Sequence, residues 1–128
     1  MIHGKYFPAE ELACRHCGGH GVKQALVSKL DELRELAGFP LPLTSAYRCS
    51  NHPRELAKES TSGSQTLGLA ADIHVFGPKA FIVLRIAFSL GFSGIGVKMH
   101  GPAAGRFIHL DLADANGEQP RPTIWGYP

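Results

Sequence analysis

The chain has 128 residues, of which 44% are hydrophobic and 19% are charged, and its formal net charge is +2. This length fits one domain with a modest core, and the composition is ordinary for a globular protein. The weak positive charge gives no reason to expect nucleic acid, and no apolar run approaches the roughly 18 residues of a membrane span. We therefore expect a monomer with one domain over residues 1–128, no nucleic-acid partner and no membrane span.

The chain begins with an arm, residues 1–21, that is irregular and rich in Gly, His and Cys. Met1–Lys5 is not followed by the apolar core of a signal peptide. We expect synthesis in the cytoplasm, or a leader that lies outside this sequence. Apolar residues spaced by three to four then predict a helix over residues 22–37, which Gly38 ends.

Shorter elements follow the first helix. We expect a strand at 41–47, a short helix at 51–59, a loop at 60–68, a strand at 69–76, a buried helix at 79–90, strands at 94–98 and 106–112, and a loop and tail at 113–128. This alternation predicts an α+β fold, in which a small antiparallel sheet of about four strands packs with two main helices.

Asp72 and His109 each interrupt an apolar run of strand type. A carboxylate in such a run is costly to bury unless a metal, an Arg or several hydrogen-bond donors accompany it. A carboxylate and an imidazole on neighbouring strands could supply two of the three protein ligands of a catalytic zinc site. The alternatives are a buried ion pair for Asp72 and an ordinary half-buried position for His109.

Several other residues near these strands have side chains suited to catalysis. Asp111 shares a strand face with His109, so it could orient the imidazole, act as a base or simply be solvated. Arg48 ends a predicted strand, and on its position alone it could be an ordinary surface arginine. His100, in a loop between two strands, could donate a proton or be merely exposed. His74 could supply a second nitrogen if the site were rearranged.

The N-terminal arm contains four potential zinc ligands within seven residues: Cys14, His16, Cys17 and His20. They could form a small structural site, although separated pairs of ligands are the commoner arrangement. Reduced surface thiols, or packing of the arm against the helix, are the alternatives. Cys49 makes the cysteine count odd, which argues against a disulfide framework.

Four motifs occur in order along most of the chain: Ser45–Arg48 (Ser-Ala-Tyr-Arg), Gly68–Asp72 (Gly-x-Ala-x-Asp), Gly94–Val97 (Gly-Ile-Gly-Val) and Phe107–Asp111 (Phe-Ile-His-Leu-Asp). Residues 121–125 (Arg-Pro-Thr-Ile-Trp) close the pattern. The chain resembles the peptidoglycan-cleaving zinc peptidases, the D-alanyl-D-alanine carboxypeptidases and phage L-alanyl-D-glutamate endopeptidases of the LAS type. The resemblance implies their Hedgehog/DD-peptidase-like fold, zinc ligation by Asp72 and His109, and a role in the cleft for Arg48.

Gln65 departs from the family pattern Ser-x-His-x-x-Gly-x-Ala-x-Asp, because it stands where the family has a third zinc ligand, His. A neutral amide oxygen is a poor zinc ligand. Gly63 also stands at the position of the Ser. Three interpretations remain open: an introduced inactivating substitution, a natural loss of catalysis, or a shifted loop in which another residue completes the site.

The resemblance implies a zinc-dependent peptidase that hydrolyses amide bonds in peptidoglycan stem peptides, weakened or inactive in this form. A phage lysis enzyme (endolysin) or a periplasmic enzyme would act in this way on the bacterial cell wall. The alternatives are a non-catalytic peptidoglycan-binding module and a small interaction domain built on a structural zinc in the Cys14–His20 segment.

Overall fold

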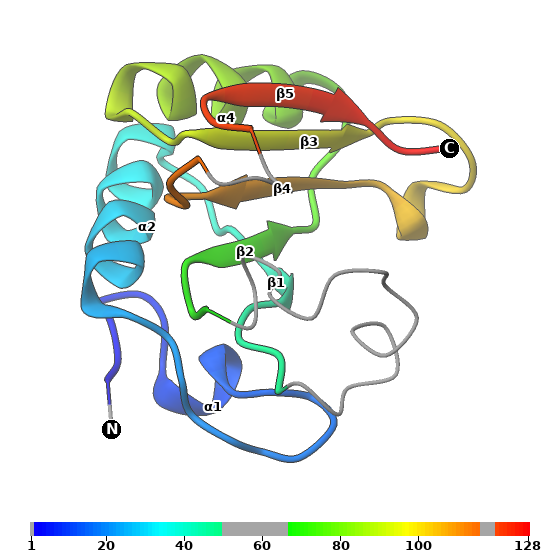
Figure 1. Cartoon of the computed structure of the whole chain (residues 1–128). Coiled ribbons are helices and arrows are strands. Elements are labelled where there is room, and N and C mark those ends of the chain that lie inside the picture. The colour runs from blue at the N-terminus through cyan, green and yellow to red at the C-terminus, as the bar shows by residue number, and fades with distance from the viewer. Residues whose placement is uncertain (1, 50–66, 116–119) are drawn as a thin grey trace.

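A computed structural model describes residues 2–49, 67–115 and 120–128 of the chain (Figure 1). Its helices and strands follow in the order α1 (Ala9–Leu12), α2 (Gln24–Ala37), β1 (Leu43–Ser45), β2 (Ala70–Ile73), α4 (Gly77–Leu90), β3 (Gly94–Lys98), β4 (Phe107–Asp111) and β5 (Thr123–Gly126), with a 3₁₀ turn at Ala103–Gly105 between β3 and β4. None of the helices in these three ranges has the length and apolar character needed to cross a bilayer.

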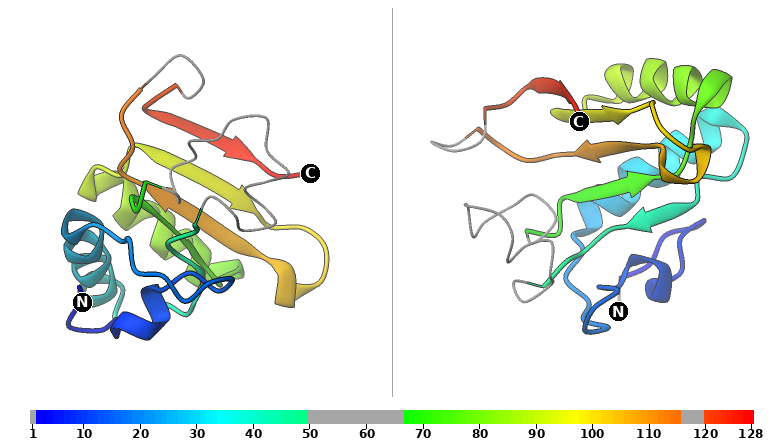
Figure 2. Two further views of the ribbon diagram at one scale, coloured as in Figure 1. Left: turned by 60° about the horizontal axis from the view of Figure 1, so that its bottom comes forward. Right: turned by 90° about the vertical axis from the view of Figure 1, so that its right-hand side faces the viewer.

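The two long helices pack against each other and lie on the same side of the sheet (Figure 2). The helix α2 buries four apolar side chains at helical spacing: Leu26, Val27, Leu30 and Leu33. Gly38 ends α2 in the left-handed conformation, with φ of 78°, and its N–H bonds the carbonyl of Arg34. Gly91 ends α4 in the same way, with φ of 83°.

The five strands form one sheet in the order β1-β2-β4-β3-β5. Strand β4 lies at its centre and pairs antiparallel with both β2 and β3. The edge strand β5 pairs parallel to β3. The sheet is therefore mixed, and its central strand contributes His109 and Asp111.

The two faces of the sheet differ sharply in polarity. Alternate residues of the inner strands point toward the helices and join the apolar core: Ala71, Ile73, Ile95, Ile108 and Leu110. The residues between them point to the other face, as the two-residue repeat of a strand requires. Asp72, His109 and Asp111 are consequently buried on the face opposite the helices.

The expected α+β fold is confirmed, and the observed sheet differs from the expected one of about four antiparallel strands in two details. A fifth strand, β5, lies within residues 113–128, which we expected to be loop and tail. Its parallel pairing makes the sheet mixed. The arm predicted as irregular also contains the short helix α1. The helix expected at 51–59 and most of the loop expected at 60–68 lie outside the described residues.

Candidate active site

Asp72 and His109 face each other across two paired strands. They are direct partners in the register of β2 and β4, and Asp72 Oδ1 lies 3.0 Å from His109 Nδ1. Both side chains are buried, with 4% and 5% of the residue surface exposed. The structure thus brings together the carboxylate and the imidazole that the sequence placed on two strands.

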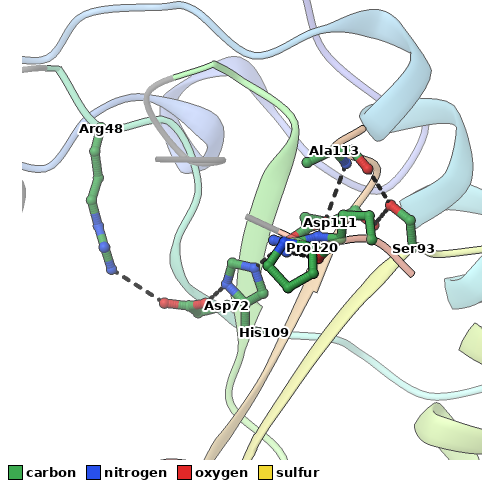
Figure 3. A network of polar contacts seen from close by, with 8 residues as sticks. Arg48, Asp72, Ser93, His109, Asp111, Ala113 and Pro120 are labelled. Carbon is green, nitrogen blue, oxygen red and sulfur yellow. Dashed lines mark hydrogen bonds and ion pairs between the residues drawn. The ribbon is translucent and has the colours of Figure 1, made fainter. Parts of the chain in front are cut away.

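The second oxygen of Asp72 is paired with Arg48. The guanidinium Nη2 of Arg48 donates to Asp72 Oδ2 at 3.2 Å, and its Nε donates to Ser45 Oγ at 3.0 Å. Figure 3 shows Arg48, Asp72 and His109 as one continuous row of contacts. The buried ion pair considered as an alternative for Asp72 therefore exists beside the contact with His109.

The other nitrogen of His109 contacts a second carboxylate. His109 Nε2 lies 2.7 Å from Asp111 Oδ2 (Figure 3). Asp111 is fully buried, and Arg121 donates to both of its oxygens, at 2.9 and 2.7 Å. Burial opposes ionisation of Asp111, but hydrogen bonds from His109 and Arg121 outweigh it and hold the pKa of this carboxyl well below its usual range.

Two carboxylates therefore flank one imidazole. Burial disfavours the charged form of His109, yet its hydrogen bonds to Asp111 and Asp72 prevail and raise its pKa. A neutral imidazole carries only one N–H. If that proton lies on Nε2 toward Asp111, the lone pair of Nδ1 faces a carboxylate oxygen of Asp72. Such a contact is repulsive unless a cation, either a proton or a metal ion, lies between the two atoms.

Two glycines of β3 make room for this arrangement. A Cβ atom on Gly94 would overlap the carboxylate of Asp111, and one on Gly96 would lie 2.6 Å from Nε1 of Trp125. Trp125 comes from β5, and its ring centroid lies 5.1 Å from that of His109. The Gly-Ile-Gly motif thus allows the Asp111 carboxylate and the Trp125 indole to lie close to β3.

A cavity of about 440 Å³ opens beside Asp72. Four of its lining residues are cationic: Arg15, Arg48, Lys98 and Arg106. Asp72 is the single carboxylate among the lining residues within the described part of the chain. The excess of positive charge favours an anionic group in this cavity.

Of the other residues predicted for the site, some line the cavity and others lie away from it. Arg48 lines the cavity, as expected. His100 is exposed, and its Nε2 contacts the carbonyl of Tyr127 at 3.0 Å, in a separate apolar hollow along β5. His74 Nδ1 contacts the carbonyl of Arg106 at 3.0 Å. Gln65 lies outside the described residues, so its position relative to Asp72 is an open prediction.

The arm residues Cys14 and Cys17 lie close together, and Cys49 joins them. Their three sulfur atoms are within 4.8 Å of one another, and His16 Nδ1 lies 3.6 Å from Cys49 Sγ. Within the described residues, the group of mutually close ligand atoms is the three sulfurs alone: of the two exposed histidines that we grouped with them from the sequence, His16 contacts Cys49, and His20 is not part of the cluster. Burial opposes ionisation of Cys14, but backbone N–H groups of Cys49, Cys17 and His16 lower its pKa to about 7.

The sequence alone assigns no role at the site to four residues that the structure places there or at the cysteine cluster: Arg121, Trp125, Ser45 and Cys49. Arg121 and Trp125 are in the closing motif of the resemblance, and that motif is the signal that could have indicated them. Ser45 likewise begins the first motif. Cys49 follows Arg48 directly but lies 32 residues after Cys17, and only the folded chain brings it to the arm.

An α+β fold in which a buried carboxylate and an imidazole meet beside a cationic cavity suits a metal-dependent hydrolase. A family model described as Peptidase M15 matches residues 5–111. The chain therefore belongs to the M15 family of zinc peptidases, and the resemblance read from the sequence motifs is confirmed. Comparisons with curated proteins and with solved structures gave no match.

Proposed function

We propose that this protein is a peptidase-like protein that acts on amide bonds of peptidoglycan stem peptides, with a zinc site weakened by Gln65. The observation that carries the proposal is the contact of 3.0 Å between Asp72 Oδ1 and His109 Nδ1, with Asp111 behind the imidazole. Membership of the M15 family supports the same chemistry.

Asp72 Oδ1 and His109 Nδ1 have the chemistry and the spacing that zinc ligands require. Tetrahedral ligands at about 2.0–2.2 Å from zinc lie roughly 3.3–3.5 Å apart, close to the separation of these two atoms. Asp111 accepts from Nε2 and so leaves Nδ1 as the ligating nitrogen, an arrangement typical of zinc-bound histidine. Asp72 and His109 would hold the ion, with residue 65 as the third position.

When bound, zinc would supply Lewis-acid chemistry, polarising a scissile carbonyl and making a water molecule more acidic. The residues of this chain have separate tasks around that chemistry. Arg48 donates to the developing oxyanion or to a substrate carboxylate from its place in the cavity wall. Asp111 orients His109; because it is fully buried and paired with Arg121, it is a positioning residue and not a general base.

The substrate class is the one that the family resemblance implies, and the charge of the cavity is compatible with it. Four cationic side chains line the cavity, and stem peptides of peptidoglycan carry free carboxylates as well as amide bonds. A carboxylate bound by a guanidinium would fix the register of the peptide relative to Asp72. The bacterial cell wall is therefore the proposed site of action, for a phage lysis enzyme or a periplasmic enzyme.

Gln65 is the reason to expect weak activity. Replacing an imidazole by an amide removes one of the three protein ligands. Mutating a residue that only hydrogen-bonds to a metal ligand already costs about 10–100-fold in metal affinity or activity. We expect at least that loss in zinc affinity and in rate. His100 is the remaining candidate proton donor, and its contact with Tyr127 would have to break for it to reach the cavity.

A second function is favoured by one specific contact. Arg48 Nη2 lies 3.2 Å from Asp72 Oδ2, so the guanidinium compensates the charge of this carboxylate. A chain that had lost zinc could keep this ion pair and the cationic cavity, and so bind stem peptides without cleaving them. The protein would then be a non-catalytic peptidoglycan-binding module.

Replacing Gln65 by His separates the two functions. With zinc added, Gln65→His should release peptide fragments from purified peptidoglycan but no new sugar reducing ends, and a chelator should abolish the release. The double variant Gln65→His/Asp72→Asn is the matched control and should release none. If Gln65→His binds one zinc more than the double variant does and still cleaves no stem peptide, the binding-module function replaces the peptidase.

A further inference from the structure

A second group of metal-ligating side chains lies at the N-terminal arm. The thiols of Cys14, Cys17 and Cys49 converge from two segments far apart in the sequence, with their sulfur atoms within 4.8 Å of one another. The imidazole of His16 contacts one of the three thiols, with its Nδ1 at 3.6 Å from Cys49 Sγ. None of these residues belongs to the Asp72 and His109 site.

We propose that this cluster is a structural zinc site held by three thiolates and one imidazole: Cys14, Cys17, Cys49 and His16. With Zn–S bonds of about 2.3 Å and a Zn–N bond of about 2.0–2.1 Å, tetrahedral ligands lie roughly 3.5–3.8 Å apart. The distance between His16 Nδ1 and Cys49 Sγ has this value. The three sulfur atoms, which lie within 4.8 Å of one another, would move together by up to about 1 Å on binding, and His16 would turn toward Cys14 and Cys17. Sulfur and imidazole ligands in tetrahedral arrangement select zinc over magnesium or calcium.

The backbone around the cluster is arranged to support thiolates. The N–H of Cys49 donates to Cys14 Sγ at 3.3 Å, and the N–H of Gly19 donates to Cys17 Sγ at 3.4 Å. Hydrogen bonds to ligand atoms stabilise their charge and fix their orientation. A Cβ on Gly19 would lie 3.1 Å from the same sulfur, so glycine permits this close approach.

The turn that joins Cys14 to Cys17 is closed by its own hydrogen bonds. The N–H of Gly18 bonds the carbonyl of Cys14 at 2.8 Å, and the N–H of Cys14 bonds the carbonyl of Gly19 at 2.9 Å. Gly18 has φ of 72°, a conformation that other residues rarely adopt. The two thiols of the Cys-x-x-Cys pair are thereby held on one side of a tight turn.

The position of the cluster gives the zinc a task. Arg15 lies between two of the ligands, and Arg48 directly precedes Cys49. Both arginines line the cavity beside Asp72. Zinc would therefore join the arm to the segment after β1 and fix two of the cationic side chains of the cavity. Binding replaces the thiol protons, which pass to solvent, so uptake of zinc releases protons.

Cobalt(II) distinguishes this site from the Asp72 and His109 site, because sulfur ligands give intense charge-transfer absorption in the near ultraviolet. Reduced, metal-free protein titrated with cobalt should show this absorption at one equivalent. Cys17→Ser and Cys49→Ser should abolish it and His16→Ala should weaken it. His20→Ala and Asp72→Asn should leave it unchanged, and the latter makes the result independent of the proposed peptidase function.

Alkylation of the wild-type chain provides a test that does not depend on the folding of any variant. Zinc should protect all three cysteines from iodoacetamide, and a chelator should expose them, as peptide mass spectrometry would record. Three results would each overturn the proposal: no charge-transfer absorption, absorption that survives Cys49→Ser, or equal alkylation of Cys49 with and without zinc. A disulfide within the trio in place of bound metal would also overturn it.

Discussion

The imidazole of His109 lies between two carboxylates that have different partners. Asp111 is fully buried and is held by Arg121 through both oxygens, so it is a fixed acceptor for Nε2. Asp72 shares its charge with Arg48 and lies beside a cavity. Asp111 therefore orients the imidazole ring, and a ligand can approach from the side of Asp72, beside the cavity.

Replacing Arg48 tests whether its guanidinium contributes to the rate of amide hydrolysis or only pairs with Asp72. In the Gln65→His background, Arg48→Ala should lower kcat by roughly 10²-fold or more, the cost of losing one oxyanion donor. Arg48→Lys should recover only part of this rate, since an ammonium cannot reproduce the fork geometry of the guanidinium. Steady-state kinetics on a stem peptide would measure both.

Arg85→Ala is the control for Arg48, because this arginine is exposed on α4, which covers the other face of the sheet. It should leave kcat unchanged. An unaltered kcat in Arg48→Ala would reduce Arg48 to a structural partner of Asp72.

The buried carboxyl of Asp111 predicts acid sensitivity. Its pKa is lowered in the folded state, so it stabilises the fold above its unfolded pKa of about 3.9, and this stabilisation is lost as the pH falls toward the folded value. The free energy of unfolding of metal-free protein should therefore decrease below about pH 4. Denaturant titrations at several pH values, with a chelator present, would measure it.

Arg121→Gln provides the comparison for this pH dependence. Without the guanidinium, the folded-state pKa of Asp111 moves back toward the unfolded value, so the loss of stability in acid should be shallower than in the wild type. Arg85→Gln, on the surface of α4, should follow the wild-type curve. Parallel curves for wild type and Arg121→Gln would show that this ion pair does not set the acid response.

At the scale of elements, the close fit between β3 and the polar face of β4 explains both glycines of the Gly-Ile-Gly motif. Gly94 pairs with Asp111 in the register, and its missing side chain leaves the space that the carboxylate fills. Gly96 pairs with both His109 and Trp125 and leaves space for the indole. The positions of the site residues thus depend on a strand that supplies none of their chemistry.

Gly94→Ala should consequently destabilise the fold by about 1–3 kcal/mol, the usual cost of adding a methyl group to a closely packed site. Gly105→Ala is a matched control, because a Cβ there meets no atom within 4 Å. Equilibrium unfolding in denaturant would compare the two. Equal stability of the two variants would mean that Asp111 moves away without cost.

The periodic elements could be predicted well from the sequence, because each carries a strong local signal. The helices expected at 22–37 and 79–90 correspond to α2 (Gln24–Ala37) and α4 (Gly77–Leu90). The strand expected at 94–98 matches β3. Strand β5 gave no such signal, because it is short, follows prolines and has its register set by pairing with β3.

The pairing of Asp72 with His109 could be anticipated, since both interrupt apolar strands and the motifs of a known family surround them. The closing motif could have indicated Arg121 but not its partner Asp111, and no sequence signal indicated Cys49, because both contacts depend on tertiary structure. Arg121 reaches Asp111 from ten residues further along the chain, and Cys49 reaches the arm from beyond β1. Sequence spacing alone contains no information about either approach.

At the scale of the whole molecule, two arginines link the two candidate metal sites: Arg15 and Arg48 line the cavity beside Asp72 and adjoin the clustered cysteines in the sequence. The arm brings Arg15 to the cavity, the segment after β1 brings Arg48, and the centre of the sheet supplies Asp72 and His109. The family match over residues 5–111 spans all of these elements. The arm is therefore part of the cavity and not merely an extension of the core.

Anomalous X-ray diffraction at the zinc absorption edge, from crystals of the Gln65→His protein soaked in zinc, tests the metal site most directly. A peak should lie about 2.0–2.2 Å from both Asp72 Oδ1 and His109 Nδ1, distinct from any peak at the cysteine cluster. A map with no peak between these two atoms, and with His109 still bonded directly to Asp72, would contradict the proposal that they are zinc ligands.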